Sequence, residues 1–263
     1  MDGIATQAGM MAMVRELDLD ADTQSYITAV ELADGQSLEY SVKKAFNDFV
    51  VGCKTDQIWE AMRCTYLMMG PRTLAGSLVP LKGTTPTNIN FVNADYSRKL
   101  GLLGGAGKSI ESNFNARSNL VANSNHLAVG LGTFVDTNNA FMSRAGGYGV
   151  EGTIAIQYSN IAFNQLFYYN SHGTSLGITT VSKVAQMLAV TRNSSNFYRS
   201  HHQGNILGQS NSQISQQYPD SSFGIAQANG TRQDFFSVGD FLSYELLKGR
   251  YDTLKSDLAI STI

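Results

Sequence analysis

The chain has 263 residues, a formal net charge of −2 and a hydrophobic content of 43%, enough for a sizeable core in one large domain. Charged residues make up only 15%, against roughly 25% in ordinary globular proteins. Lysine and arginine form no basic stripe, which argues against nucleic acid as a partner. No apolar run approaches the roughly 20 residues that a membrane helix needs, and no secretory signal pattern opens the chain. We therefore expect a protein made in the cytoplasm, without a membrane partner.

Residues 1–22 are the first predicted segment. They are rich in methionine at first and then acidic, with Asp18, Asp20 and Asp22 close together. This composition predicts a flexible arm. Because methionine adapts to irregular surfaces, we expect the arm to become ordered only against a neighbouring subunit.

Residues 23–70 are predicted to be a helical segment. After the turn at Asp34-Gly35, apolar residues spaced three and four apart predict one amphipathic helix. They are Leu38, Val42, Ala45, Phe46, Phe49 and Val50. A second helix is expected from Asp56, which can act as an N-cap, to Gly70-Pro71. We expect Trp59 to anchor these helices against the sheet.

Residues 71–239 are predicted to form an all-β sandwich, because short alternating apolar runs are separated by Gly, Asn, Pro and Ser. Between residues 127 and 132, large apolar residues alternate with Ala128, Gly130 and Gly132. Small residues on one face of a strand predict the close approach of a neighbouring sheet or loop.

Two hairpins are expected in the second half of this region. One joins residues 185–191 to 196–200, and the other joins 223–227 to 234–237 through the turn signal Asn229-Gly230. A last helix and a tail are expected over residues 240–263, with Asp240 as the N-cap of the helix. Its apolar stripe consists of Leu242, Leu246, Leu247, Tyr251, Leu254 and Leu258.

The two cysteines, Cys53 and Cys64, both fall in the predicted helical segment. The favoured interpretation is two reduced, half-buried thiols, although adjacent antiparallel helices would allow a disulfide. A metal site would need more ligands than these and four scattered histidines. We therefore predict neither a metal nor a cofactor.

No catalytic pattern stands out. The segment Gly104–Ser109 lacks the phosphate-loop spacing, since Leu102 stands where the first glycine is required, and a glycine-rich β-turn is the better interpretation. A glycosidase would need paired carboxylates, and the predicted sandwich has only Glu111 and Glu151 as glutamates. Its aspartates are predicted to lie mostly in turns. These observations disfavour an enzyme, and no catalytic residue is assigned.

Aromatic residues and histidines meet at two places that could bind a partner. His201 and His202 follow Phe197–Ser200 at a predicted strand end and could form an exposed patch that stacks on sugar or contacts a subunit. A solvated hairpin end is the simpler interpretation. Near His172, an aromatic run raises the same question, with core packing as the simpler interpretation. The candidate contact residues are Tyr168, Tyr169, His172, Tyr198, His201 and His202.

Five further segments have distinctive sequences: residues 34–59, 74–83 (Leu-Ala-Gly-Ser-Leu-Val-Pro-Leu-Lys-Gly), 86–102, 190–198 and 235–243 (Phe-Phe-Ser-Val-Gly-Asp-Phe-Leu-Ser). Together they resemble a group of virion proteins of tailed phages from marine and other environments. The resemblance spans the chain from about residue 23 to its C-terminus. One turn departs from the family pattern, because Gly105–Glu111 lacks the aspartate that relatives carry there. A metal or ligand function of that aspartate would be missing here.

The resemblance implies a concanavalin A-like or laminin-G jelly-roll sandwich with N-terminal helices and a C-terminal helix. It also implies a structural protein on the exterior of a virion, whose partners are other phage virion proteins. The weakly charged polar surface, the arm and the edge strands favour packing with copies of itself, as a trimer or another symmetric oligomer. A tail component that contacts host-surface glycan is the first expectation. Capsid decoration, as a cement or head-fibre protein, is the alternative, and a glycan-degrading enzyme is a weaker third. Calcium binding stays open, because Asp and Asn in turns serve both structure and ligation.

Overall fold

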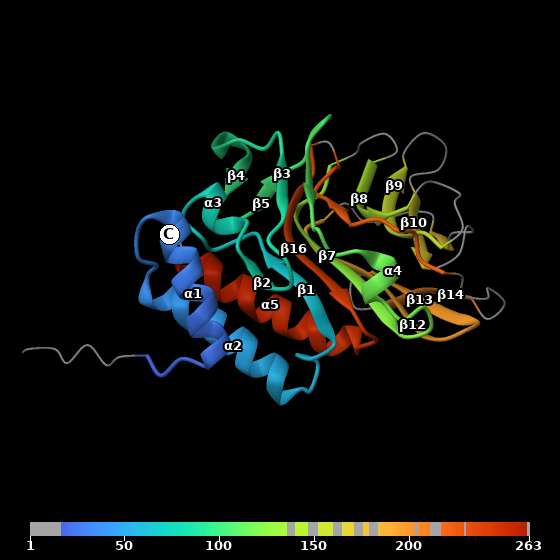
Figure 1. Cartoon of the computed structure of the whole chain (residues 1–263), viewed down its shortest axis with the longest axis horizontal. Helices are drawn as coiled ribbons and strands as arrows, with labels where there is room; N and C mark the ends of the chain where they lie inside the picture. Colours follow the sequence, from blue (N-terminus) through green and yellow to red (C-terminus); the bar gives the residue numbers. More distant parts are fainter. Residues whose placement is uncertain are drawn as a thin grey trace, which may run out of the picture.

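The structure is a computed structural model that describes residues 17–135, 140–146, 152–159, 165–170, 176–178, 184–202, 205–210, 217–228 and 230–261. Within these residues the strands form two antiparallel sheets, A and B, packed as a sandwich, and three long helices lie together over sheet A (Figure 1). The predicted mainly β sandwich of jelly-roll type is confirmed.

Sheet A contains the central strands. Its order is β14 (Asn205–Ser210), β13 (Phe197–His202), β12 (Met187–Ser194), β7 (Asn125–Thr133), β16 (Arg232–Gly239), β1 (Met62–Leu67) and β2 (Pro80–Lys82), with β5 (Gly101–Leu103) beside β16 and β4 (Tyr96–Ser97) beside β5. Val129 of β7 lies opposite Leu188 of β12 and Phe236 of β16, which sets the register at the centre.

Sheet B runs β11 (Leu176–Ile178), β10 (Gln165–Asn170), β9 (Ile154–Ser159), β8 (Ala140–Ala145), β15 (Gly224–Ile225), β6 (Ser109–Glu111) and β3 (Thr87–Ile89). The long helices are α1 (Ala21–Asp34), α2 (Tyr40–Thr55) and α5 (Tyr244–Ser261). Shorter helices are α3 (Leu74–Ser77), α4 (Ala116–Asn119) and a 3-10 turn at Asn93–Asp95.

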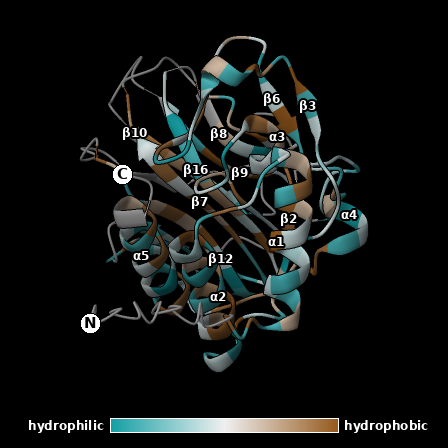
Figure 2. Cartoon of the chain, turned by 90° about the vertical axis from the view of Figure 1, so that its left-hand side faces the viewer, coloured by the Kyte–Doolittle hydropathy of each residue, from teal (hydrophilic) through white to brown (hydrophobic). Residues whose placement is uncertain are grey.

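Sheet A has a hydrophobic core on each face. Along β16, Phe236 belongs to the core between the sheets, whereas Phe235 belongs to the core beneath the helices. Successive side chains of a strand point to opposite faces, so a strand covered on both sides is apolar throughout. Figure 2 shows the helices with both hydrophobic and hydrophilic segments, as expected for helices that bury one face.

The small residues of β7 allow close packing, as predicted. A Cβ atom added at Gly132 would lie 2.1 Å from the carbonyl oxygen of Leu100, so a loop approaches there. At Gly130 the neighbours are Asp234 Oδ1 at 2.5 Å and Tyr251 Cε2 of α5 at 2.6 Å. The element against Gly130 is therefore a helix as well as the neighbouring strand.

The second predicted helix, from Asp56 to Gly70-Pro71, is wrong. Helix α2 ends at Thr55, and Asp56 is its C-cap. Gln57 then has a φ of 58°, which turns the chain, and residues 62–67 form β1, paired with β16. The predicted helical segment 23–70 is therefore not separate from the sandwich, because it supplies one of its inner strands.

The two predicted hairpins had different outcomes. The first is confirmed as β12 and β13, with its turn at Ser195 and Asn196. The second is wrong, because β15 belongs to sheet B and β16 to sheet A. The chain crosses between the sheets there, and Asn229 of the predicted turn lies outside the described residues.

The predicted terminal segments also need correction where the structure describes them. Helix α5 begins at Tyr244 rather than after Asp240, and its predicted stripe is buried except for Leu246, which is 42% exposed. Residues 17–22 belong to the fold, since the Asp20 side chain caps α1 and its backbone nitrogen donates to Asn47 of α2. Residues 1–16 of the predicted arm lie outside the described residues.

Candidate functional site

The candidate site is an apolar groove between α1 and the edge strand β2, which we call the α1–β2 groove. Its volume is about 690 Å³. It is lined by Asp22, Ser25, Tyr26, Ala29, Ala33, Trp59, Ala75, Leu78, Val79, Pro80, Leu81, Lys82, Thr85 and Pro86. The residues from α1 are spaced three and four apart, so they form one face of the helix.

The α1 wall is formed largely by small side chains. Ser25, Ala29 and Ala33 are exposed on the groove side of α1, while Tyr26 is 3% exposed and belongs to the helix–sheet core. Small residues let the opposite wall come close without filling the space. The groove is therefore open along the helix and closed at its base by the core.

The opposite wall is the end of sheet A. Strand β2 pairs with β1 and stands last in the order of the described strands, so it is an edge strand. Pro80 lacks a backbone N–H, which is tolerated at such an edge. An edge strand offers backbone groups to another chain. The groove thus combines apolar side chains with an open sheet edge.

Trp59 forms part of the base but offers no open ring face. Its side chain is 5% exposed, and the amino groups of Lys82 and Lys54 lie 4.5 and 5.6 Å from its ring centroid. Lys82 Nζ also donates to the carbonyl oxygen of Trp59 at 2.8 Å. The predicted anchoring role is confirmed, since Trp59 lies in the core shared by helices and sheet.

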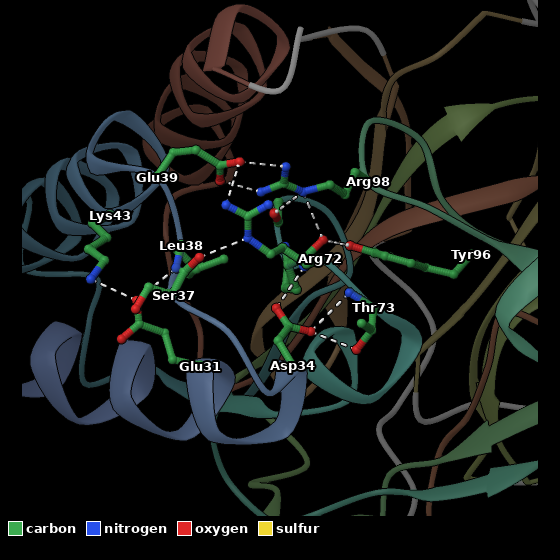
Figure 3. A network of polar contacts seen from close by, with 12 residues as sticks. Glu31, Asp34, Ser37, Leu38, Glu39, Lys43, Arg72, Thr73, Tyr96 and Arg98 are labelled. Carbon is green, nitrogen blue, oxygen red and sulfur yellow. Dashed lines mark hydrogen bonds and ion pairs between the residues drawn. The ribbon is translucent and has the colours of Figure 1, made fainter.

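Asp34 and Glu39 belong to a polar network that holds the elements around the groove in position (Figure 3). Asp34, the last residue of α1, accepts from the backbone nitrogens of Arg72 at 2.7 Å and Thr73 at 2.9 Å, just before α3. A Cβ at Gly76 would lie 2.2 Å from Asp34 Oδ1. Since glycine alone leaves room for this carboxylate, α1 and α3 are held at a set distance.

Glu39 extends the same network to the sandwich. It binds Arg72 Nη2 at 2.8 Å and two nitrogens of Arg98, which follows β4 (Figure 3). Arg98 Nε donates to the carbonyl oxygen of Gly70 at 2.9 Å. Hydrogen bonding from Arg98 lowers the pKa of Glu39 to about 2. This paired carboxylate is suited to holding elements together rather than to proton transfer.

The predicted aromatic and histidine patch does not exist as an exposed surface. The side chains of Tyr168, Tyr169, Tyr198, His201 and His202 are all buried, with exposures between 0% and 5%. Neither the exposed patch nor the solvated hairpin end is therefore correct, whereas core packing is correct for Tyr168 and Tyr169. His172 lies outside the described residues.

Tyr198 and His201 face opposite sides of sheet A. Tyr198 packs between the sheets, where the Arg192 guanidinium lies 4.9 Å from its ring centroid. His201 stacks on Tyr244 of α5 with centroids 4.4 Å apart, and burial lowers its pKa to about 4. Side chains three apart in a strand point to opposite faces, so these two cannot share one sugar.

The glycine-rich segment forms a turn before Ser109, as predicted, and Ser109 begins β6. The backbone nitrogen of Lys108 donates to Gly105 O at 3.0 Å, and its Nζ donates to Asp95 Oδ1 at 2.5 Å. This ion pair lowers the pKa of Asp95. Lys108 therefore links this turn to the 3-10 turn that contains Asp95.

The carboxylates considered for catalysis have structural partners. Glu111 accepts from the hydroxyls of Ser109 and Ser222, and Asp240 pairs with Arg63. Asp234, expected in a turn, is instead buried in β16 and binds Lys255. Glu151 lies outside the described residues. Among the described residues, no three His, Cys, Asp or Glu side chains gather so as to hold a metal ion.

The cysteines are free and fully buried, rather than half-buried as expected. Cys53 of α2 lies in the helix–sheet core, whereas Cys64 lies in β1 and belongs to the core between the sheets. Burial raises the pKa of each thiol to about 12. In the described part of the chain no helix is long and apolar enough to cross a membrane.

No known protein family matches this chain, and no curated protein sequence does. Solved structures of similar fold include the receptor-binding domain of botulinum neurotoxin D, at 11% identity and a TM-score of 0.52 over 73% of this chain and 52% of that one. Another is botulinum neurotoxin type C, whose cell entry depends on interaction with two ganglioside molecules, at 11% identity and a TM-score of 0.50 over 74% and 51%.

The binding domain of botulinum neurotoxin DC in complex with rat synaptotagmin II matches at 10% identity and a TM-score of 0.51, over 74% of this chain and 52% of that one. This chain thus spans about half the length of these toxin chains. At such identities the likeness establishes the fold, a β-sandwich that binding domains also use.

Proposed function

We propose that this chain is a structural protein on the exterior of a tailed-phage virion, placed in the tail as part of a fibre, spike or baseplate. The observation that carries the proposal is that the segments resembling phage virion proteins contact one another. Glu39 from one segment binds Arg98 from another, and Leu81 shares a core with Phe235. The segments that carry the resemblance therefore lie in one folded unit of this chain, which supports the proposal.

A binding role rather than catalysis is supported by the chemistry of the described residues. Their candidate catalytic carboxylates are held by cations or hydroxyls. Away from these carboxylates, an apolar groove lies at a sheet edge. Such a surface suits contacts with protein chains, and we propose that the protein is not an enzyme.

Contact with host-surface glycan is part of the proposal for the tail. Its support is the sandwich fold, which this chain shares with a toxin whose cell entry depends on gangliosides. The contact residues first considered for sugar are buried, so a glycan surface would have to lie elsewhere. Capsid decoration, as a cement or head-fibre protein, is the second candidate, favoured by the apolar groove as a place for a shell or subunit contact.

Immunogold labelling of intact particles tests the placement. An antibody against the purified protein is applied to virions, and antibody pre-absorbed with the same protein is the control. We expect specific label on the tail or its tip. Label over the head would replace the tail assignment by capsid decoration, and particles without specific label would overturn the exterior virion role.

Glycan contact is tested separately on the purified protein. Binding to an array of bacterial surface polysaccharides should be saturable for at least one glycan and leave that glycan unchanged in length. Flat binding curves would leave a purely structural role. Shortened polysaccharide would overturn the assignment as a non-enzyme.

A further inference from the structure

We propose that the α1–β2 groove binds residues Met10–Val14 from the N-terminal arm of a second copy of this chain. The inference concerns assembly of the protein with itself, so it stands apart from the location proposed for it in a virion. It rests on the dimensions of the groove, its chemistry, the composition of residues 1–16 and the way the chain enters α1.

The length of the groove suits a short extended segment. Its α1 wall runs from Asp22 to Ala33, which is about 17 Å at the rise of an α-helix. Five residues in an extended strand also span about 17 Å. A segment as long as Met10–Val14 would therefore fill the groove from end to end.

The chemistry of the groove suits an apolar strand. Leu78, Val79 and Leu81 face the small side chains of α1 across the cavity. The free edge of β2 can add one more strand through backbone hydrogen bonds, with alternate side chains entering the apolar space. An added strand would meet apolar surface on the groove side and solvent on the other.

The arm has the matching composition. No charged residue lies between Gly3 and Val14. Met11 and Met13 lie two apart, so they share one face of an extended strand, and methionine side chains fill irregular apolar space. Arg15 follows the apolar segment directly. The pocket that shares Asp22 and Trp59 with the groove carries both signs of charge, because Lys54 pairs with Asp22 and Lys82 lies 3.7 Å from Glu60. The match between the groove and the segment is therefore one of apolar surface.

The entry of the chain into α1 favours a second copy over the same chain. Leu19 packs on the helix–sheet core, and Asp20 donates its backbone N–H to Asn47 of α2 at 2.8 Å. Lys54 binds both Asp20 and Asp22, at 2.6 Å each. The groove lies on the side of α1 that faces α3 and β2, so the chain's own arm would have to turn back around the start of α1.

Reciprocal exchange of arms would close a symmetric oligomer. A two-fold exchange gives a dimer, and a head-to-tail exchange gives a ring such as the trimer expected from the sequence. The groove is incomplete in one chain alone, because its occupant comes from another. Assembly and arm binding are therefore predicted to be lost together.

Mixed cysteine cross-linking tests this proposal. Met13→Cys and Ala29→Cys are made as separate variants, mixed, allowed to exchange and oxidised. The native thiols do not interfere, because Cys53 and Cys64 are buried and their pKa values are raised to about 12. We expect a disulfide-linked pair of chains on non-reducing gels. Thr28→Cys replaces Ala29→Cys in the control, because Thr28 is exposed on α1 but does not line the groove.

Each outcome decides the proposal. A linked pair with Ala29→Cys and not with Thr28→Cys supports it. Equal linking of both, or of neither, overturns it. Linking within one chain in the Met13→Cys, Ala29→Cys double variant, without linked pairs in the mixture, assigns the groove to the chain's own arm and overturns the exchange.

A second measurement uses variants that block the groove. Ala29→Arg should lower the oligomer mass in light scattering to that of one chain, whereas Thr28→Arg should leave the oligomer intact. Both positions are exposed, so an unchanged far-ultraviolet circular dichroism spectrum is expected for each. Oligomers that persist in Ala29→Arg would overturn the proposal.

Discussion

Arg98 and Glu39 form a two-pronged ion pair across the boundary between the helical layer and the sandwich. Arg98 Nη1 donates to Oε1 at 3.0 Å and Nη2 donates to Oε2 at 2.6 Å. Parallel hydrogen bonds of this kind fix orientation as well as distance. Because Arg98 also binds the carbonyl of Gly70, one side chain joins the start of α2 to the loop before α3.

Glu39→Gln should therefore destabilise the protein in a pH-dependent way. The pKa of Glu39 falls from 4.5 to about 2 in the folded state. A depressed carboxylate pKa adds stability that is fully present above pH 4.5 and lost as the pH falls towards 2. Since the pair is partly exposed, we expect a loss of about 1 kcal/mol at neutral pH, or about 2–4 °C in Tm.

Thermal melts of both proteins between pH 7 and pH 2.5 measure this difference. The gap in Tm should narrow below pH 4.5. Asp48→Asn is the control, because it breaks an exposed ion pair with Lys44 within α2 and should change stability by less than about 0.5 kcal/mol. A gap for Glu39→Gln that stays constant down to the lowest pH would contradict the assigned role.

Gly130→Ala should destabilise the joint between β7 and α5. The added Cβ would lie 2.5 Å from Asp234 Oδ1 and 2.6 Å from the ring of Tyr251, and overpacking of a filled core costs about 1–3 kcal/mol. Gly249→Ala is the matched control, because its Cβ would meet nothing within 4 Å on α5. It should stabilise the helix by about 0.5–1 kcal/mol. Urea unfolding measures both, and equal effects would refute the packing argument.

The burial of sheet A on both faces explains which elements could be predicted from the sequence. The stripes of α2 and α5 were predictable, because helices with one face in solvent show a clear period. Strand β1 was not, because sheet A is covered on both faces and the strand is buried at all positions except Arg63. Its sequence therefore lacks the apolar–polar alternation of a half-buried strand. Asp56 and Gly70-Pro71, which flank it, are residues that also begin and end helices.

Because sheet A is covered on both faces, the prediction that the candidate contact residues are exposed was wrong. Tyr198 and His201 look like a polar, aromatic strand end in sequence, but one lies under sheet B and the other under α5. The α1–β2 groove could not be predicted, because it joins residues near 22–33, 59 and 75–86. These segments meet only through tertiary contacts such as that of Asp34 with Thr73.

Lys255→Met should destabilise the protein more at pH 7 than at pH 4. Asp234 is fully buried, and it accepts from Lys255 Nζ at 2.7 Å and from the Tyr251 hydroxyl at 2.8 Å. Removing one partner of a buried pair costs about 3–5 kcal/mol. Burial already raises the pKa of Asp234, so the unpaired carboxyl can take up a proton as the pH falls, which reduces the cost.

Urea unfolding at the two pH values measures this change. Lys248→Met is the control on the same helix, because it breaks a pair with the half-exposed Asp252 and should cost less than about 1 kcal/mol at either pH. An equal loss at both pH values for Lys255→Met would show that Asp234 is not the group that responds.

His126 should make the wild-type protein sensitive to mild acid. Its ring is fully buried in β7, with Nδ1 2.6 Å from Asp240 O and Nε2 2.9 Å from Ser237 Oγ. Because a carbonyl only accepts, Nδ1 carries the proton and Nε2 accepts from the serine hydroxyl. The imidazole is thus held neutral, and burial lowers its pKa from 6.5 to about 4.

A depressed histidine pKa gives stability that is present above pH 6.5 and lost as the pH falls towards 4. The loss over this range is on the order of 3 kcal/mol for one such group, and His201 has a similarly lowered pKa. His126→Asn keeps a donor towards Asp240 but cannot titrate. It should be less stable than the wild type at pH 7, and its free energy of unfolding should fall less from pH 6.5 to pH 4.

Adding His201→Gln should reduce this pH dependence of the free energy of unfolding further, because the second titrating ring is then also absent. Urea unfolding across this pH range measures the slopes. An unchanged slope in His126→Asn would assign the acid sensitivity to other groups.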